Sequence, residues 1–386
     1  MREKLSMAFA ISLTVPWLLV LFLNVKLPPH FEALLSGMAI ISSAFIISWC
    51  AETAEMDIPR SLSLALVAFL AVLPEYAVDI YFAWMAGKLN GSYVHFATAN
   101  MTGANRLLIG VGWSLVALTA MFKTRKTQVE LDEGLRLEIF VLLVATLYSF
   151  TIPLKSSIHP IDSVILLSLY ALYLYMATKG CREEFPLEGV PKYLSRFPKS
   201  LRRTILIVLF VYSGFVIFLS VDAFAEGLIS TAKAFGFDEY LMVQWIAPLA
   251  SESPELVVAI YLVRRLRVSA SINALVSSKV NQWTLLIGTL PLVYSLALNS
   301  ISPLPLDPRQ KEELILTSSQ SLFGLAVISN LRISLWEALA LLTLFLAQFV
   351  YEGVEMRLIL SAIYVVLSIP ILVREKRSVS KILKVL

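Results

Sequence analysis

Two glutamates in matching surroundings are the residues of this 386-residue chain best suited to chemistry. Glu75 lies in the segment PEYAVDIY (74–81) and Glu255 in the segment PELVVAIY (254–261), so both copies fit the pattern PExxVxIY. Each glutamate follows a proline, whose ring removes one helical hydrogen bond and disturbs the carbonyl group one turn earlier. Two carboxylates with loosened carbonyl oxygens make an all-oxygen site that suits a hard cation such as Ca²⁺. Because no Cys or His lies nearby in the sequence, a zinc or copper site is not expected.

Further acidic residues accompany this pair. Asp79 follows Glu75 by four residues, and Glu252 precedes Glu255 by three. Residues at these spacings share one face of a helix. Such pairs can bind a divalent cation together, and they can also share a proton, because two like charges at short distance favour protonation of one of them.

A second polar stretch follows each copy of the motif. The first contains Thr98, Asn100, Thr102, Gly103 and Asn105, and the second contains Asn273, Ser277, Ser278, Lys279, Asn281 and Gln282. Amides and hydroxyls can ligate a cation, but in membranes they also join helices to one another. We expect Asn100, Ser278 and Asn281 to be the ligands in these stretches. Asp222 and Glu226, four residues apart, form a further acidic pair that can extend an ion pathway.

The composition of the chain sets the kind of element that must position these residues. Hydrophobic residues make up 58% of the sequence and charged residues 16%, and the mean hydropathy is +0.77. A soluble domain has roughly 45–50% apolar and about 25% charged residues, so a soluble protein, a disordered protein and a nucleic-acid binder are all excluded. The sequence contains no nucleophile–His pair, cofactor loop or zinc motif, so we expect neither an enzyme nor a bound cofactor. The predicted fold class is an all-α polytopic membrane protein.

Twelve stretches are apolar and long enough to cross the hydrocarbon core, which takes about 20 residues. They are 6–26, 32–51, 61–87, 92–122, 137–153, 161–178, 204–232, 239–263, 271–297, 312–331, 334–351 and 355–373. If the N-terminus lies inside and the stretches alternate, 23 of the 32 Lys and Arg residues fall on the inner side and 7 on the outer side. This split satisfies the positive-inside rule and predicts that both termini are cytoplasmic. The two remaining cations, Arg106 and Lys279, fall inside predicted membrane helices.

The motif around the two glutamates belongs to a longer internal repeat. The tetrapeptide Leu-Leu-Ile-Gly begins 32 residues after Glu75, at 107–110, and 30 residues after Glu255, at 285–288. The two motif copies lie on the third and eighth predicted spans, so they cross the membrane in opposite directions. An inverted-topology repeat of this kind is typical of secondary transporters that bind their substrate near the membrane midplane.

This repeat predicts two inverted five-helix halves with one extra helix at each end of the chain. The predicted parts are an N-terminal transmembrane helix (1–31), a first repeat (32–178), a cytoplasmic linker (179–203), a second repeat (204–351), and a C-terminal transmembrane helix with a basic tail (352–386). The linker is charged, contains three prolines and lies near the midpoint of the chain.

Three short segments of these repeats resemble the cation/calcium exchanger superfamily, which includes sodium/calcium and proton/calcium exchangers. The segments are LAVLPE (70–75), ASESPE (250–255) and NMTGAN (100–105). Members of that family carry two inverted repeats, each with a G-T-S-L-P-E-like motif on a broken helix and N-x-x-G-S-N on the next helix. The resemblance covers about residues 32–351 and implies that Glu75 and Glu255 are the central Ca²⁺-binding glutamates. It also implies that Asn100 is the first Asn of the second motif.

The chain departs from the family pattern at positions that bear on ion coupling. Residues 70–72 replace Gly-Thr-Ser, which removes hydroxyls expected to help bind sodium. The second polar stretch of the second repeat has no G-S-N. Alignment on Leu-Leu-Ile-Gly places Ser278 opposite Asn100, whereas an ungapped alignment on the nearby Asn pairs Asn273 with Asn100.

Lys279 lies close to the predicted site and is open to several interpretations. Its ammonium can occupy the space of a coupling monovalent ion, pair with Glu252 or Asp79, take part in proton coupling, or form a purely structural ion pair. Arg106, which follows Asn105, is expected to be a similar counter-charge.

The sequence therefore predicts a cation antiporter that expels Ca²⁺, or a similar divalent cation, against Na⁺ or H⁺ by alternating access. A passive divalent-cation channel that uses the same carboxylates as a selectivity ring is the alternative, and the repeat favours the transporter. A non-transporting membrane protein is disfavoured by the paired central glutamates. The expected partners are the transported cations and the lipid bilayer of a prokaryotic plasma membrane, without nucleic acid. The sequence does not indicate an oligomeric state.

Overall fold

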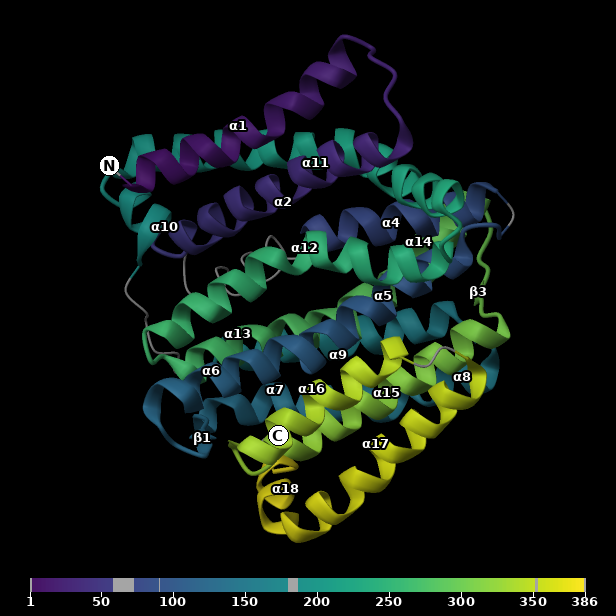
Figure 1. Cartoon of the computed structure of the whole chain (residues 1–386). Coiled ribbons are helices and arrows are strands. Elements are labelled where there is room, and N and C mark those ends of the chain that lie inside the picture. Colours follow the sequence, from purple (N-terminus) through teal and green to yellow (C-terminus); the bar gives the residue numbers. More distant parts are fainter. Residues whose placement is uncertain (1, 58–72, 90, 180–186, 351–352, 385–386) are drawn as a thin grey trace. The chain divides into compact units, whose positions relative to one another are not determined.

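The computed structural model describes residues 2–57, 73–89, 91–179, 187–350 and 353–384, and its secondary structure is almost entirely helical (Figure 1). The described chain forms two compact units. Unit 1 consists of residues 1–82 and 177–254, and unit 2 consists of residues 83–176 and 255–386. Each unit thus takes residues from both halves of the sequence. The chain passes from unit 1 to unit 2 within α4 and again within α12, the two helices that carry the PExxVxIY motif.

Unit 1 is built from the first helices of both halves. Its elements are α1 (Arg2–Phe22), α2 (Pro29–Ala54), α10 (Gly189–Leu194), α11 (Lys199–Phe235), the beginning of α4 (Leu73–Lys88) and most of α12 (Glu239–Arg264). Helix α2 begins with a proline in its first turn, where the missing N–H costs no helical hydrogen bond. Helices α2 and α11 lie side by side (Figure 1), and Trp17 of α1 packs with Ala39 and Val216 to form a core between the three helices.

Part of the predicted linker folds onto unit 1. Val190 and Leu194 of α10 pack into an apolar cluster with residues from α1, α2 and α11. Arg202, at the start of α11, donates to both carboxylate oxygens of Asp57 at 2.8 and 2.7 Å. Residues 180–186 of the linker lie outside the described residues. The remainder is a structured connection that fixes the loop after α2 to the start of α11.

Unit 2 contains the other helices and all described strands. Its elements are α5 (Val94–Leu107), η1 (Leu108–Trp113), α6 (Ser114–Thr124), β1 (Gln128–Glu130), η2 (Glu133–Leu135), α7 (Arg136–Ser149), α8 (Thr151–Lys155), β2 (Ser157–Ile158), α9 (Pro160–Ala177), α13 (Val268–Asn281), η3 (Gln282–Leu286), α14 (Ile287–Leu298), β3 (Leu304–Pro305), α15 (Pro308–Ile328), β4 (Arg332–Ser334), α16 (Leu335–Val350), α17 (Val354–Arg374) and α18 (Lys376–Ile382).

Two short antiparallel ladders join the two halves of the sequence within unit 2. Strand β1 pairs with β4, with Val129 opposite Ile333, and strand β2 pairs with β3, with Ile158 opposite Leu304. In each ladder one strand comes from the first half and the other from the second. The loops at which the halves meet are therefore held by backbone hydrogen bonds.

The helices that carry the second polar stretches each change into a π-helical segment. Helix α5 continues through η1 into α6, and α13 continues through η3 into α14, without an interruption of the helical backbone. Both π-helical segments lie at or beside the repeated Leu-Leu-Ile-Gly tetrapeptide. Such segments are rare and frequently occur at functional sites.

The glycines of the two tetrapeptides lie at helix crossings. A Cβ atom on Gly110 would lie 2.3 Å from Cγ of Phe345 in α16, and one on Gly288 would lie 3.2 Å from Cγ of Leu167 in α9. Helix α16 ends the second half and α9 ends the first, so each tetrapeptide packs against the last helix of the other half. Small residues at such crossings let membrane helices approach closely.

Eight helices among the described residues are long and apolar enough to cross a membrane. They are Glu3–Phe22, Pro29–Ala54, Val94–Thr124, Glu133–Lys155, Pro160–Ala177, Lys199–Phe235, Glu239–Arg264 and Val354–Arg374. The other four predicted spans overlap α4, α13 to α14, α15 and α16, which are shorter or more polar than these eight. Residues 61–72 of the third predicted span lie outside the described residues. Helix α15 has a low hydropathy because it is rich in polar residues, and most of its residues are buried.

Helix α12 differs from the broken helix that the family resemblance implies. It continues from Glu239 to Arg264 through Pro248 and Pro254. The hydroxyl of Ser251 donates to the carbonyl of Ala247 at 3.2 Å, and the hydroxyl of Ser253 donates to the carbonyl of Leu249. These are the bonds to the carbonyl four residues earlier that serine hydroxyls make within a helix, and they do not involve the carbonyls freed by the two prolines. Pro254 still cannot donate to the carbonyl of residue 250.

Candidate functional site

The predicted acidic ligands are buried to different degrees. Glu75 and Asp79 lie one turn apart on α4 and are 2% and 0% exposed, and Glu252 on α12 is 1% exposed. All three belong to unit 1. Glu255 belongs to unit 2 and is partly buried. Carboxylates at membrane depth are costly unless something neutralises them, so this burial fits groups that bind a cation or a proton.

Asn100 is the most telling of the predicted amide ligands. Its side chain is 0% exposed, and neither its amide nitrogen nor its amide oxygen has a hydrogen-bond partner among the described residues. A buried polar group left without partners costs about 1–3 kcal/mol. A bound ion or water would supply the missing contact, which agrees with the predicted ligand role.

Ser278 and Asn281 lie on the last turn of α13 and are 8% and 3% exposed. They belong to unit 2 together with Asn100 and Glu255. Asn273, the alternative partner of Asn100 in the alignment, is less buried and lies two turns earlier on α13. The burial pattern thus agrees better with the alignment that places Ser278 opposite Asn100.

Lys279 is held by the first polar stretch. Its Nζ donates to the backbone carbonyl of Asn105 at 3.1 Å and to the Asn105 Oδ1 at 2.7 Å, and it lies 4.6 Å from the centre of the Trp283 ring. Lys279 and Asn105 are 1% and 0% exposed. The amide nitrogen of Asn105 donates to the carbonyl of Met101 at 2.8 Å, which turns its oxygen toward the lysine. Asn105 therefore joins α5 to α13.

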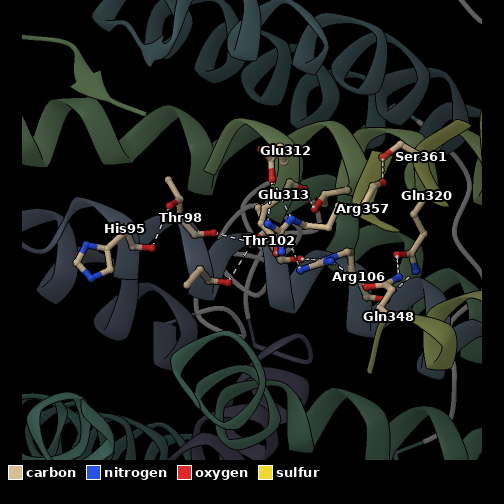
Figure 2. Close-up of polar contacts among 12 residues, drawn as sticks. His95, Thr98, Thr102, Arg106, Glu312, Glu313, Gln320, Gln348, Arg357 and Ser361 are labelled. Atoms are coloured by element: carbon tan, nitrogen blue, oxygen red, sulfur yellow. Dashed lines mark hydrogen bonds and ion pairs between the residues drawn. The ribbon is translucent and has the colours of Figure 1, made fainter. Parts of the chain in front are cut away.

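Arg106, the residue after Asn105, forms a buried ion pair with Glu313 of α15 (Figure 2). The distance from Nη2 to the Glu313 carboxylate is 2.6 Å, and the two side chains are 2% and 3% exposed. Arg106 also donates to Gln348 of α16 at 2.8 Å, and its carbonyl accepts from Gln320 of α15 at 3.1 Å. The predicted role of Arg106 as a counter-charge now has a definite partner in the structure.

The C-terminal helix α17 completes this network (Figure 2). Arg357 of α17 donates to Glu312 from Nε at 3.1 Å and from Nη2 at 2.9 Å, and its Nη1 lies 3.7 Å from Glu313. Glu313 is thus shared by Arg106 and Arg357. The sequence reasoning missed Glu312, Glu313, Gln320 and Gln348; for the first three, the available signal was the accumulation of polar residues in α15.

Tyr81, the last residue of the first PExxVxIY motif, contacts the acidic pair of α11. Its hydroxyl lies 2.7 Å from Asp222 Oδ1 and 2.9 Å from Glu226 Oε1. Both acids were predicted to extend an ion pathway, whereas the tyrosine was noted only as part of a pattern. The contact links the glutamate-bearing helix α4 to α11 within unit 1.

No group of three or more His, Cys, Asp or Glu side chains in the described part of the chain is arranged to hold a metal ion. A Ca²⁺ site formed by the predicted residues would therefore combine carboxylates with amide, hydroxyl and carbonyl oxygens. Oxygen donors of all these kinds ligate Ca²⁺.

Comparison with known proteins bears on these assignments. The family model described as sodium/calcium exchanger protein matches residues 31–179 and 205–352. A crystal structure of the H⁺/Ca²⁺ exchanger CAX is 57% identical in sequence, with a TM-score of 0.97, and the match covers 100% of this chain and 97% of that chain.

Two more distant structures have the same fold. YfkE is 16% identical with a TM-score of 0.64, and the match covers 94% of this chain and 99% of that one. The sodium–calcium exchanger NCX_Mj, soaked with Na⁺ and Sr²⁺, is 16% identical with a TM-score of 0.54, and the match covers 84% and 99% of the two chains. A search of curated proteins finds no match.

Proposed function

Because the chain belongs to the sodium/calcium exchanger protein family, we propose that it is an integral membrane antiporter that exchanges Ca²⁺ for H⁺ by alternating access. The observation that carries the choice of proton is the 57% identity to the H⁺/Ca²⁺ exchanger CAX over the whole chain. The similarity to NCX_Mj is a similarity of fold alone. A passive channel has no support among these relatives.

The physical basis of the exchange is the burial of carboxylates. Glu75 and Glu255 bind Ca²⁺ in this proposal, helped by Asp79 and Glu252, and protons neutralise the same groups when Ca²⁺ leaves. A buried carboxylate without either partner is strongly disfavoured. Ca²⁺ and protons compete for the same carboxylate oxygens, so the two forms of the site exclude each other. Because the empty charged site is disfavoured, Ca²⁺ and protons must replace one another, which is the condition for exchange without leakage.

Amide and hydroxyl oxygens complete the proposed ligand set. Asn100 contributes its amide, and its buried side chain without a protein partner is the structural support for this role. Ser278 and Asn281 contribute from α13. Lys279 and Arg106 serve as the fixed positive charges next to the site, and no resident cofactor is needed.

The proposed architecture is twelve membrane helices in two inverted five-helix repeats (32–178 and 204–351) between the terminal parts 1–31 and 352–386. The two ladders support it, because β1 and β3 follow the helices with π-helical segments in the two halves and β2 and β4 follow the next helices, so that the pairings β1–β4 and β3–β2 are equivalent. The equivalent crossings of Gly110 and Gly288 support it as well. The excess of basic residues on one side favours cytoplasmic termini and a cytoplasmic linker (179–203), and a prokaryotic plasma membrane is the proposed location.

The function is tested by uptake of ⁴⁵Ca²⁺ into proteoliposomes with an imposed pH or sodium gradient. The pH gradient is expected to drive uptake above the level set by the Ca²⁺ gradient, whereas the sodium gradient is not. Glu75→Gln and Glu255→Gln are expected to abolish the driven uptake. Glu130→Gln is the matched control, because the Glu130 side chain is 72% exposed in a surface ladder. Uptake that responds to neither gradient would favour a channel. Uptake driven by the sodium gradient alone would mean that the coupling ion is Na⁺ and not H⁺.

A further inference from the structure

The surroundings of the Lys279 ammonium are those of a bound monovalent cation. The Asn105 carbonyl and the Asn105 Oδ1, two oxygens without net charge, accept from this ammonium, and the face of the Trp283 ring lies beside it. Uncharged carbonyl oxygens are the groups that replace the hydration shell of monovalent ions in selective sites. Aromatic faces attract cations as well.

The oxygens of Asn105 are oriented toward a cation independently of the lysine. The Asn105 amide nitrogen is committed to the carbonyl of Met101, so its oxygen is the atom left to face Lys279. The backbone carbonyl of Asn105 lies three residues before η1 begins, and at η1 the regular helical bonding pattern changes. The position between α5 and α13 would therefore still present two oxygens if the ammonium were removed.

The location of this ammonium ties it to the proposed ion site. Lys279 directly follows Ser278 and precedes Asn281 by two residues on α13, and Asn105 lies on the same helix as Asn100. A charge fixed here acts on both second polar stretches of unit 2.

We propose that Lys279 is a built-in monovalent cation: its ammonium permanently occupies a position between α5 and α13 that would otherwise take Na⁺ or K⁺. Exchange then proceeds without such an ion, and the counter-ion that remains is the proton. Lys279 is thus a specificity-determining residue for the coupling ion. The inference rests on the proposed exchange of Ca²⁺ for H⁺ and explains why sodium does not take part in it.

The test removes the ammonium from its position between α5 and α13 by mutation and asks whether a monovalent cation in solution can replace it. Lys279→Ala leaves space at the Asn105 oxygens, whereas Lys279→Met fills the space without a charge. ⁴⁵Ca²⁺ uptake driven by a pH gradient is measured in choline, sodium and potassium chloride, with Lys233→Gln as control because the Lys233 side chain is 63% exposed. Wild type and control are expected to be indifferent to the salt. In choline, Lys279→Ala is expected to be slower by about tenfold, the loss that one charge-assisted hydrogen bond would cause.

Sodium or potassium is expected to restore much of the Lys279→Ala rate, and neither is expected to restore Lys279→Met. A correctly folded Lys279→Ala that is equally slow in every salt would overturn the inference, as would a variant that retains the wild-type rate in choline. Thermal unfolding in detergent gives a second readout that does not require transport. There the monovalent salts should stabilise Lys279→Ala more than wild type, and equal stabilisation of both proteins would also overturn the inference.

The outcome for wild type separates this inference from the proposed function. If wild type shows no uptake driven by a pH gradient, the proposed exchange is wrong, whatever the variants do. If wild type shows it and Lys279→Ala shows no dependence on monovalent cations, only the role of Lys279 is wrong.

Discussion

Arg106 of α5 and Glu313 of α15 form a 2.6 Å ion pair that is almost completely buried. Arg106 follows Asn105, the residue that binds Lys279. Two consecutive residues of α5 therefore engage a cation of α13 and an anion of α15. This arrangement fixes the helix that carries Asn100 from two sides within unit 2.

Removal of one member of this pair should destabilise the protein strongly. Glu313→Gln leaves the Arg106 guanidinium buried without its carboxylate, a situation that costs about 3–5 kcal/mol when one partner of a buried pair is lost. Thermal unfolding in detergent measures the effect. Glu133→Gln is the control, since Glu133 pairs with Arg136 while 81% exposed and should lose about 1 kcal/mol or less.

The double variant Arg106→Gln, Glu313→Gln should lose less stability than the sum of the two single variants, because it leaves no uncompensated charge. Additive losses would show that the two side chains act independently, in contradiction to the ion pair.

The glycines of the repeated tetrapeptide should differ in their tolerance of alanine. Gly110→Ala places a Cβ 2.3 Å from Phe345, a separation that requires helices to move, whereas Gly288→Ala places one 3.2 Å from Leu167, which demands a smaller shift. Overpacking costs about 1–3 kcal/mol, and Gly110→Ala should lie at the upper end. Thermal unfolding and the fraction of monodisperse protein report the loss.

Gly214→Ala is the matched control for this pair. Nothing lies within 4 Å of a Cβ built on Gly214, and alanine is the better helix former, so this variant should be as stable as wild type or slightly more stable. The double variant Gly110→Ala, Phe345→Gly removes the Phe345 Cβ, 2.5 Å from the added methyl group, together with the ring, and should lose less stability than the sum of the two single variants if the clash is the cause. A Gly110→Ala protein as stable as Gly214→Ala would rule out the close crossing.

The sequence was sufficient to identify polar residues whose burial is costly. Glu75, Asp79, Glu252 and Asn100 stand out in apolar stretches, and the structure buries all of them. Composition and span length likewise predicted a helical membrane protein. These inferences succeed because each depends on a local property, the transfer cost of one side chain or one segment.

The sequence does not indicate which side chains contact each other when the helices pack together. Glu313 lies near the start of α15 and resembles a solvated helix-end charge in the sequence, but α17 and α5 bring Arg357 and Arg106 to it. The π-helical segments have no sequence signal of their own, and α12 continues through Pro248 and Pro254, where the family resemblance implies a broken helix.

The pair of Asp57 and Arg202 should make the stability of the protein depend on pH. Hydrogen bonds from Arg202 hold the pKa of the Asp57 carboxyl below its usual value of 3.8. Because the pKa is lowered in the folded state, the stabilisation is complete above the usual value and is lost as the pH falls through the folded value. Asp57→Asn should therefore be less stable than wild type by about 1 kcal/mol at pH 7.

Thermal midpoints of wild type and Asp57→Asn, measured from pH 7 to pH 3, test this dependence. The gap between the two proteins should stay constant down to about pH 5 and close below the usual carboxyl pKa. A gap that persists unchanged at the lowest pH would mean that Asp57 contributes through packing and not through its charge.

Replacement of Asn100 should weaken Ca²⁺ binding without lowering the stability of the Ca²⁺-free protein. Its fully buried amide has no hydrogen-bond partner among the described residues, so the folded protein without ligand carries the cost of that group. Asn100→Leu removes the polar atoms at similar volume and should leave the thermal midpoint without Ca²⁺ unchanged or raise it. The same variant should lose the stabilisation that Ca²⁺ gives wild type, because a ligand that binds the folded state stabilises it by an amount that rises with the logarithm of its concentration relative to the dissociation constant. Thr98→Val is the control. Thr98 lies two residues before Asn100 on α5, and its hydroxyl already donates to the carbonyl of His95 at 3.0 Å, so Ca²⁺ should still stabilise this variant. A large drop in the Ca²⁺-free midpoint of Asn100→Leu would show that the amide has a protein partner, and undiminished stabilisation by Ca²⁺ would remove Asn100 from the ligand set.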